Sequence, residues 1–274
     1  MKFKYYLNEA GDYYSGYYKK ERTIVIDHEQ AIKWIKRYSY KVAMVYKNDS
    51  TSRIYRNLSK SRGDVLISKG TEERRSRNTS NFYTLFINYD KRWADFPKRE
   101  IVCLSDLSWG GYLIFPADNT KLGICPDADM WYTKIYYNIH NHDKEINMEE
   151  FNSLITHIIK YCQDKNIAIP SDVEFNMNSL KSFFKTIDKK IIPEINKNEK
   201  YSCPELLIAA QQSNMSLYDI CSKMLDPQKL SMKVETVGCS LPKNIEVWCE
   251  APAVGIYTAK NLKYIDQVLE EILS

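Results

Sequence analysis

Glycine is scarce in this sequence, and its scarcity limits how the chain can bind a phosphate group. Only nine glycines occur among the 274 residues. The patterns G-x-x-x-x-G-K-[ST], G-x-G-x-x-G and G-x-S-x-G are absent, which excludes a P-loop, a Rossmann-type dinucleotide turn and the nucleophile elbow of α/β-hydrolases. A nucleotide bound by this chain would therefore be held by side chains and strand ends.

Long hydrophobic runs and paired cysteines are missing as well. No stretch of 18 apolar residues occurs, and the first residues, MKFKYYLNEAGDYY, lack the apolar region of a secretory signal. We therefore expect a cytoplasmic protein with no membrane segment. Seven cysteines are widely scattered without a C-x-x-C pair, so we expect reduced, buried thiols rather than disulfides or a zinc site.

The sequence does contain ample material for a packed core, and its charge is unevenly distributed. Hydrophobic residues make up 44% and aromatic residues 13% of the chain, which is typical of a globular protein. Residues 1–100 hold 22 Lys or Arg against 12 Asp or Glu, a net charge of +10, and the remainder carries −6. Unless it is simply a solvated surface, this basic part favours an anionic ligand such as a nucleotide, a nucleic acid or an acidic protein surface.

The order of the expected elements indicates an α+β protein. They are a helix from about Asp27, strands at 40–46, 53–58 and 64–68, a helix at 81–96, strands at 100–106, 110–117 and 121–126, amphipathic helices within 147–232, strands at 232–240 and 244–257, and a helix at 262–273. The late strands need partners, which the earlier strands can supply. We therefore predict a catalytic α+β core of residues 1–146 and 233–274, with 147–232 as a helical insertion in the same domain.

An acidic residue stands inside one of the expected strands. Glu246 lies among Ile245, Val247 and Trp248, whose β-branched and aromatic side chains favour a strand. A carboxylate in a buried strand costs free energy unless it is paired or used. The alternative is an edge strand, from which Glu246 points to solvent while Ile245 and Val247 point inward.

Three short segments share the order and the context of a known triad. Arg56 stands in IYRN on one expected strand, Ser105 in VCLSDLS on a second, and Glu246 in NIEVW on a late one. In this order they resemble the Arg, Ser and Glu motifs of the ADP-ribosyltransferase superfamily. That family usually has Glu or Gln two residues before its glutamate, where this chain has Asn244. Its serine motif usually reads Ser-Thr-Ser, so Ser108 competes with Ser105 as the motif serine.

The resemblance implies an ADP-ribosyltransferase-like split β-sheet core with flanking helices, NAD as the substrate and no metal. Glu246 would bind a ribose hydroxyl and stabilise the oxocarbenium-like centre that forms as nicotinamide leaves. Arg56 would pair with the diphosphate, and Ser105 would position the glutamate or the ribose. Ordinary structural roles are the alternative: Arg56 could be a surface charge or pair with Asp64, and Ser105 could start a turn before Asp106.

A second basic segment, ERRSRNTSNFYTLF at 73–86, precedes and enters the expected helix at 81–96. Helix N-termini bind anions through free backbone N–H groups, and nearby basic side chains strengthen the effect. We therefore expect further cofactor contacts from Arg77 and Asn81. Tyr83 could stack on nicotinamide or adenine, as aromatic walls do in this superfamily, or it could be a core residue at helical spacing from Ile87.

The resemblance extends to the bacterial toxin and phage-conflict branches of the superfamily. It implies transfer of ADP-ribose to a macromolecular acceptor, which could be a protein, RNA or DNA, and it leaves room for a neutralising antitoxin or inhibitor protein as a partner. The alternative function is a non-enzymatic nucleic-acid or protein binding module that uses the basic N-terminal half. His140 and His142 lie in an Asn-rich stretch without further ligands at metal spacing, so no metal site is expected.

Overall fold

The computed structural model describes residues 23–58, 63–68, 90–98, 101–109, 111–126, 134–139, 142–147, 164–166, 177–186, 188–189, 193 and 216–274. The chain divides into two compact units. The hairpin unit comprises residues 1–17, 75–94 and 131–231, and the sheet unit comprises residues 18–74, 95–130 and 232–274. The predicted division into a core of 1–146 and 233–274 with an insertion at 147–232 stays a prediction.

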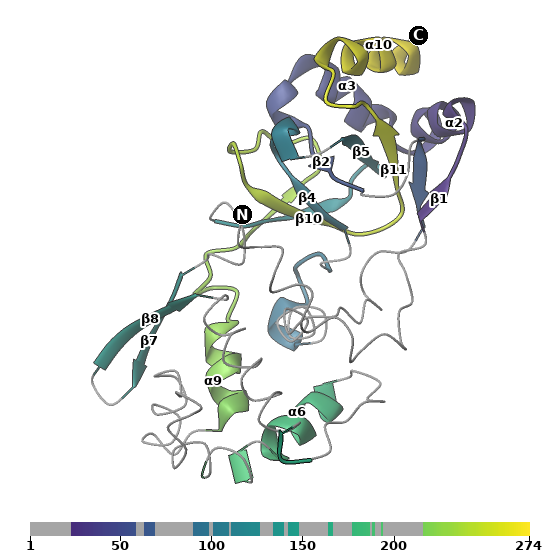
Figure 1. The fold of residues 1–274 in the computed structure, drawn as a ribbon. Coiled ribbons are helices and arrows are strands. Elements are labelled where there is room, and N and C mark those ends of the chain that lie inside the picture. Colours follow the sequence, from purple (N-terminus) through teal and green to yellow (C-terminus); the bar gives the residue numbers. More distant parts are fainter. Residues whose placement is uncertain are drawn as a thin grey trace. The chain divides into compact units, whose positions relative to one another are not determined.

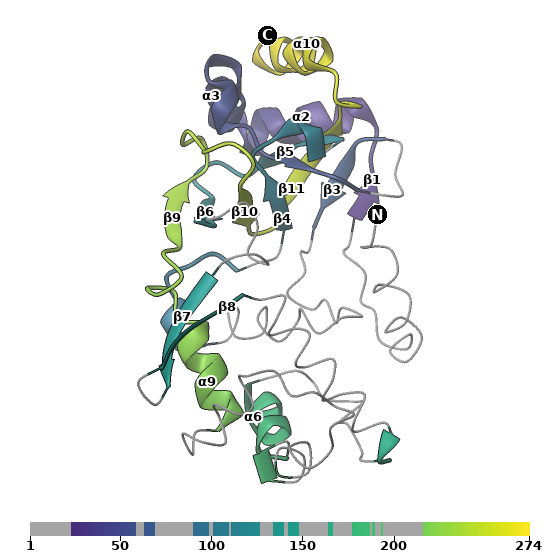
Figure 2. The ribbon, with the colours of Figure 1, turned by 60° about the vertical axis from the view of Figure 1, so that its left-hand side comes forward.

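The sheet unit is built on an antiparallel sheet of nine strands (Figures 1 and 2). In sheet order these are β1 (Thr23–Val25), β3 (Val65–Ile67), β11 (Ala253–Tyr257), β5 (Tyr112–Pro116), β2 (Tyr55–Arg56), β4 (Ile101–Leu104), β10 (Glu246–Cys249), β6 (Lys121–Ile124) and β9 (Lys233–Thr236). Most are short and rich in Val, Ile, Leu and Tyr, the residues that suit a pleated, buried surface. Helices combined with an antiparallel sheet give the predicted α+β class.

Three helices of the sheet unit pack on one face of the sheet: α2 (His28–Tyr38), α3 (Tyr40–Asn48) and α10 (Leu262–Leu273) (Figures 1 and 2). The Asp27 side chain caps α2 by accepting a hydrogen bond from the backbone N of Gln30 (2.7 Å). The Tyr46 hydroxyl of α3 donates to the carbonyl oxygen of Ile114 on β5 (3.1 Å). The helices predicted from Asp27 and at 262–273 are therefore confirmed.

The strand predicted for residues 40–46 is wrong, because this segment lies in helix α3. Val42 and Tyr46 are buried at helical spacing. The cap of α3 comes from a distant part of the chain: the Asp118 carboxylate, in the turn between β5 and β6, accepts a hydrogen bond from the backbone N of Val42 (3.1 Å). The hydroxyl of Ser39, at the N-cap position, donates instead to backbone carbonyls at the end of β5. These tertiary contacts override the local β-propensity.

His28, the first residue of α2, links this helix to β3 and α10. Its Nδ1 lies 2.5 Å from Oδ2 of Asp64, and its Nε2 lies 3.2 Å from Oε2 of Glu271. Both nitrogens can donate only when the imidazole is protonated. Partial burial lowers the pKa of His28, but the hydrogen bonds and charges of the two carboxylates outweigh burial and raise it above the ordinary value of 6.5.

Within its described residues, the hairpin unit contains a two-stranded antiparallel hairpin and the helices α6 and α9 (Figure 1). These are β7 (Lys134–Ile139), β8 (His142–Asn147), α6 (Met177–Thr186) and α9 (Leu217–Met224). The Trp93 indole N–H donates to the carbonyl oxygen of Leu225 (2.8 Å), which ties a short 3-10 helix at Lys91–Trp93 to the end of α9. The prediction of helices within 147–232 is confirmed for α6 and α9, whereas the hairpin was not predicted.

Two broader expectations concern the cysteines and the membrane. Four cysteines in the described ranges are free thiols: Cys103, Cys125 and Cys249 are buried, and Cys239 is partly buried. These four agree with the expected reduced thiols. None of the helices within the described ranges is long and apolar enough to cross a membrane.

Candidate functional site

The three strands that carry the predicted triad are neighbours in the sheet. β2, β4 and β10 follow one another in sheet order, although their residues lie far apart in the sequence. Tyr55 pairs with Leu104, and Leu104 pairs with Glu246. Because adjacent strands lie about 4.8 Å apart, the backbones at Arg56 and Glu246 are separated by about two strand spacings, roughly 10 Å.

Glu246 opens β10 in the interior of the sheet and not at its edge. β10 pairs with β4 on one side and with β6 on the other. The residue is 4% exposed, and its carboxylate accepts a hydrogen bond from the indole N–H of Trp248. The alternative that Glu246 points to solvent from an edge strand is therefore wrong. A carboxylate buried in a central strand calls for polar partners or for a function.

Side-chain contacts decide which face of the sheet Glu246 occupies. Burial raises the pKa of Tyr46, on α3, well above its ordinary value of 10.0, and the nearby thiols of Cys103 and Cys249 add to the shift. Cys103 and Cys249 therefore lie on the face of the sheet that α3 covers. Because successive strand residues point to opposite faces, Glu246 and Trp248 point away from the helices.

Arg56 ends β2 and is 8% exposed. The preceding residue, Tyr55, lies close enough to Tyr46 of α3 to help raise the pKa of its hydroxyl, so alternation puts Arg56 on the face away from the helices, which is the face of Glu246. The single described bridge between β2 and β4, Tyr55 opposite Leu104, would by itself give Tyr55 the face of Glu246. The two pairs between β2 and β5 outweigh it, because Tyr55 is opposite Leu113, on the face of Phe115, whose ring contacts Tyr46 of α3. The carboxylate of Asp64, the alternative partner of Arg56, is bound instead by the imidazole at the start of α2 and by a backbone N–H of β11.

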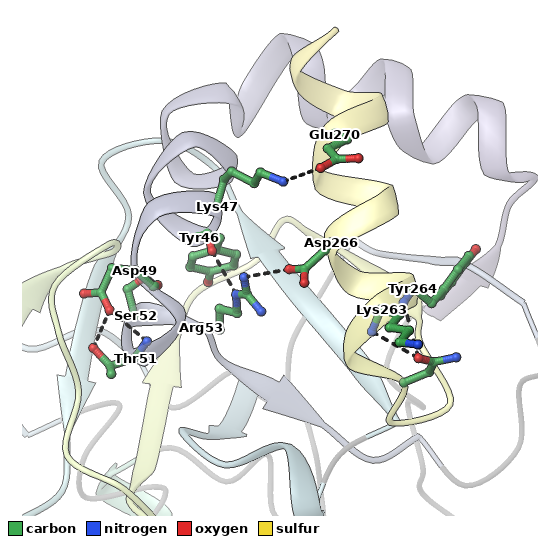
Figure 3. Close-up of polar contacts among 11 residues, drawn as sticks. Tyr46, Lys47, Asp49, Thr51, Ser52, Arg53, Lys263, Tyr264, Asp266 and Glu270 are labelled. Atoms are coloured by element: carbon green, nitrogen blue, oxygen red, sulfur yellow. Dashed lines mark hydrogen bonds and ion pairs between the residues drawn. The ribbon is translucent and has the colours of Figure 1, made fainter.

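A second arginine near β2 has a structural role (Figure 3). Arg53 is 5% exposed, and its Nε donates to the carbonyl oxygen of Tyr46 at the end of α3 (2.8 Å). Its Nη2 lies 3.3 Å from Oδ1 of Asp266 on α10. Arg53 thus joins the chain entering β2 to two helices, on the face of the sheet opposite to Arg56.

Ser105 stands directly after β4, and it holds the chain that leads into Glu246. Its hydroxyl donates to the carbonyl oxygen of Pro242 (2.5 Å) and accepts from the backbone N of Ile245 (3.0 Å). The backbone N of Ser105 donates to the carbonyl oxygen of Ile245 (3.0 Å). These three bonds fasten residues 242–245 to the end of β4, so Ser105 positions the backbone of the glutamate.

Ser108, the competing serine, lies in a short 3-10 helix at Leu107–Trp109 and is exposed. Its backbone N donates to Oδ1 of Asp106 (2.6 Å), and hydrogen bonds from Ser108 hold the pKa of Asp106 below its ordinary value of 3.8. Its carbonyl oxygen accepts from the ammonium of Lys260. None of these contacts involves the chain before β10. Of the two serines, Ser105 is thus the one that contacts the chain leading into Glu246.

Asn244, where the family pattern has Glu or Gln, is exposed and adopts a φ of 56°. This left-handed conformation is tolerated by Asn better than by longer side chains, because the short amide can compensate locally. The turn that leads the chain into β10 therefore favours Asn at this position.

Three other predicted cofactor contacts, Arg77, Asn81 and Tyr83, lie outside the described residues, and so does His140. Across the parts of the chain that the structure describes, no group of three or more His, Cys, Asp and Glu side chains is arranged to hold a metal ion. The described site residues all belong to the sheet unit.

The sequence-based predictions missed an aromatic pair beside Arg56. Arg56 pairs with Tyr112 on β5, and Tyr112 pairs with Tyr257 on β11. The two tyrosine rings are 5.1 Å apart between centroids, at an interplanar angle of 53°. No local signal in the sequence marks this pair, because its two tyrosines lie on strands that are far apart in the chain and meet only in the sheet.

Comparisons with known proteins assign no family to this chain. No protein-family model, no curated protein and no solved structure matches it. The interpretation of the site therefore depends on the geometry and chemistry of its residues.

Proposed function

We propose that this chain is a mono-ADP-ribosyltransferase that cleaves NAD and transfers ADP-ribose to a protein or nucleic-acid acceptor, as a toxin or a host–phage conflict effector. The observation that carries the proposal is the order β2, β4, β10 in the sheet. The Arg-Ser-Glu pattern occupies three segments distant in sequence, and chance matches to short motifs have no reason to fall on consecutive strands. The shared face of Arg56 and Glu246 adds to this support.

The proposed reaction makes use of the buried carboxylate. The bond between the ribose C1′ and the nicotinamide nitrogen breaks, and its electron pair leaves with nicotinamide. Positive charge develops on the ribose, and the Glu246 carboxylate stabilises it. Because the site is buried, this attraction is stronger than it would be in water. A nucleophile of the acceptor then bonds to C1′ and loses its proton.

Arg56 and Ser105 have supporting roles in this scheme. In NAD the diphosphate follows the ribose, and a guanidinium about two strand spacings from Glu246 suits that position because it can pair with two phosphate oxygens at once. Ser105 acts through the backbone that it holds, so it is a positioning residue. A change at Ser105 should therefore alter the placement of Glu246 without removing a charge from the site.

Access to the site requires movement. Arg56 and Glu246 are 8% and 4% exposed, so NAD can contact them only after the side chains that cover them move aside. We therefore expect NAD binding to change the hydrogen-exchange rates of backbone amides in β2 and β10. An unchanged exchange pattern at saturating NAD would count against these two residues as the NAD site.

The decisive experiment compares Glu246→Gln with Glu235→Gln, an exposed glutamate on β9. Glutamine keeps an oxygen that can accept the Trp248 N–H, so the fold should be retained. Nicotinamide release from NAD is expected to fall by about a hundredfold or more in Glu246→Gln and to be unchanged in Glu235→Gln. Mass spectrometry of cellular RNA, DNA and protein would identify the acceptor. Absence of nicotinamide release by the wild type with every acceptor class would refute the proposal.

A second candidate function is non-enzymatic nucleic-acid binding, and one surface favours it. The corner between α2 and α3 exposes three cations and two aromatic rings: Lys36, Arg37, Lys41, Tyr38 and Tyr40. The Arg37 guanidinium lies 5.0 Å from the centroid of the Tyr38 ring. Cations follow phosphates and exposed rings stack on bases. Binding of single-stranded RNA that is lost in Lys36→Glu/Arg37→Glu, with no effect of Glu246→Gln on any activity, would support this function.

A further inference from the structure

A line of three residues crosses the sheet from Arg56 to its exposed aromatic neighbour. Arg56 on β2 is directly opposite Tyr112 on β5, which is directly opposite Tyr257 on β11. Directly opposed residues of antiparallel strands point to the same face. Tyr257 therefore lies on the face of Arg56, about two strand spacings away, or roughly 10 Å.

Tyr257 is held in place while its ring stays accessible. The residue is 39% exposed, whereas Tyr112 beneath it is 1% exposed. The backbone N of Tyr257 donates to Oδ1 of Asp64 (2.8 Å), which fixes the strand at this point. A Cβ added to Gly111 would lie 3.3 Å from Cε2 of Tyr257, so glycine at 111 leaves room for the ring. The result is an exposed ring supported by a buried one.

The order of chemical groups along this face matches the order of groups in NAD. Glu246, Arg56 and Tyr257 lie on β10, β2 and β11, and Arg56 is two strands from each of the others. In NAD the diphosphate separates the nicotinamide ribose from the adenosine. If Glu246 acts on the ribose and Arg56 binds the diphosphate, the adenine base extends toward β11. An aromatic ring is a suitable platform there, because every base presents a π-face.

We propose that Tyr257, supported by Tyr112, is the platform on which the adenine ring of NAD stacks. This inference rests on the proposed function, since it takes the roles of Glu246 and Arg56 as given. It assigns adenine recognition to the last strand of the sheet, a position that the sequence pattern did not indicate. It also predicts that ligands with an adenosine moiety are distinguished from ligands without one at this residue.

The test measures dissociation constants for ADP-ribose, which carries adenosine, and nicotinamide mononucleotide, which lacks it. Tyr257→Leu keeps an apolar cover over Tyr112 but removes the aromatic face. ADP-ribose binding is expected to weaken roughly five- to hundredfold, while nicotinamide mononucleotide binding is unchanged. Tyr257→Phe should bind both as the wild type does. Met44→Leu, at an apolar residue of α3 that is 41% exposed, is the control and should have no effect.

A second variant keeps the inference testable if Tyr257→Leu fails to fold. Tyr257→Trp enlarges the platform, so it should bind ADP-ribose at least as tightly as the wild type. Its added fluorescence, relative to the wild type, should be quenched by ADP-ribose but not by nicotinamide mononucleotide. Absence of that difference would overturn the inference.

The remaining outcomes separate this inference from the proposed function. If Glu246→Gln abolishes nicotinamide release while Tyr257→Leu binds ADP-ribose as tightly as the wild type, the adenine platform is wrong and the proposed function stands. Equal weakening of both ligands in Tyr257→Leu would likewise overturn the platform, because the effect would not be specific to adenosine. If the wild type neither binds ADP-ribose nor cleaves NAD, both proposals fail.

Discussion

Replacing Ser105 with alanine removes one hydroxyl and, with it, two hydrogen bonds that hold the approach to β10. The carbonyl oxygen of Pro242 loses its donor at 2.5 Å, and the backbone N–H of Ile245 loses its acceptor at 3.0 Å. A typical intramolecular hydrogen bond contributes about 0.5–1.5 kcal/mol to stability. Because Ser105 is partly exposed, water can replace part of this loss. We expect Ser105→Ala to lower the free energy of unfolding by about 1–2 kcal/mol.

Ser108→Ala is the control, because Ser108 is exposed and does not contact the chain before β10. The variant loses the side-chain hydrogen bond to Asp106 at the surface and keeps the backbone contacts. Its cost should be within about 0.5 kcal/mol. Urea unfolding followed by circular dichroism measures both variants, and the slope of free energy against urea should be the same in each. Ser105→Thr keeps a hydroxyl and should recover most of the stability.

The same variants test the role of Ser105 in positioning Glu246. If Ser105→Ala slows nicotinamide release while Ser108→Ala does not, and if Ser105→Thr restores the rate, the hydroxyl acts by placing the start of β10. Equal stability of Ser105→Ala and Ser108→Ala would refute the geometric reasoning, because the two hydrogen bonds would then contribute nothing. Loss of stability in Ser105→Ala with full activity would refute the positioning role alone.

Three further predictions concern the sheet unit. Arg53→Met removes the donors of a buried guanidinium and should lower the free energy of unfolding, measured in urea, by about 2–3 kcal/mol. Asp266→Ala should lower it by less than about 1 kcal/mol, because that carboxylate is 56% exposed. Equal costs would contradict the importance of the carbonyl contact of Arg53. The pKa of His28 is raised in the folded protein, so its contribution to stability is complete below pH 6.5 and is lost as the pH rises through the raised value. His28→Gln should lack this fall in stability, and identical pH profiles would rule out the linkage. Asn244→Val should lower stability by about 1–2 kcal/mol because of its left-handed φ, while Asn244→Gly should stay near the wild type in thermal unfolding.

The elements that the sequence predicted well are those with local signals. Asp27 precedes an amphipathic segment and caps α2. The strand predicted at 244–257 was correct in type but not in extent, because the chain breaks at residues 250–252 into β10 and β11, which β5, β2 and β4 separate in the sheet. The segment at 40–46 failed because its deciding contact, the Asp118 carboxylate on the N-terminus of α3, comes from a turn between two later strands. A local propensity cannot report a cap that arrives through tertiary folding.

The candidate site, too, has features that the sequence indicates locally and features that depend on tertiary contacts. The sequence by itself determined the types of chemical group, because an acid such as Glu246 in an apolar strand and an arginine such as Arg56 next to a tyrosine stand out without any structure. Only the tertiary structure decided that β2, β4 and β10 are adjacent, that Ser105 rather than Ser108 holds the chain before β10, and that Tyr257 shares the face of Arg56. The physical reason is that strand order and side-chain facing depend on pairing and packing between distant segments, which no short stretch of sequence encodes.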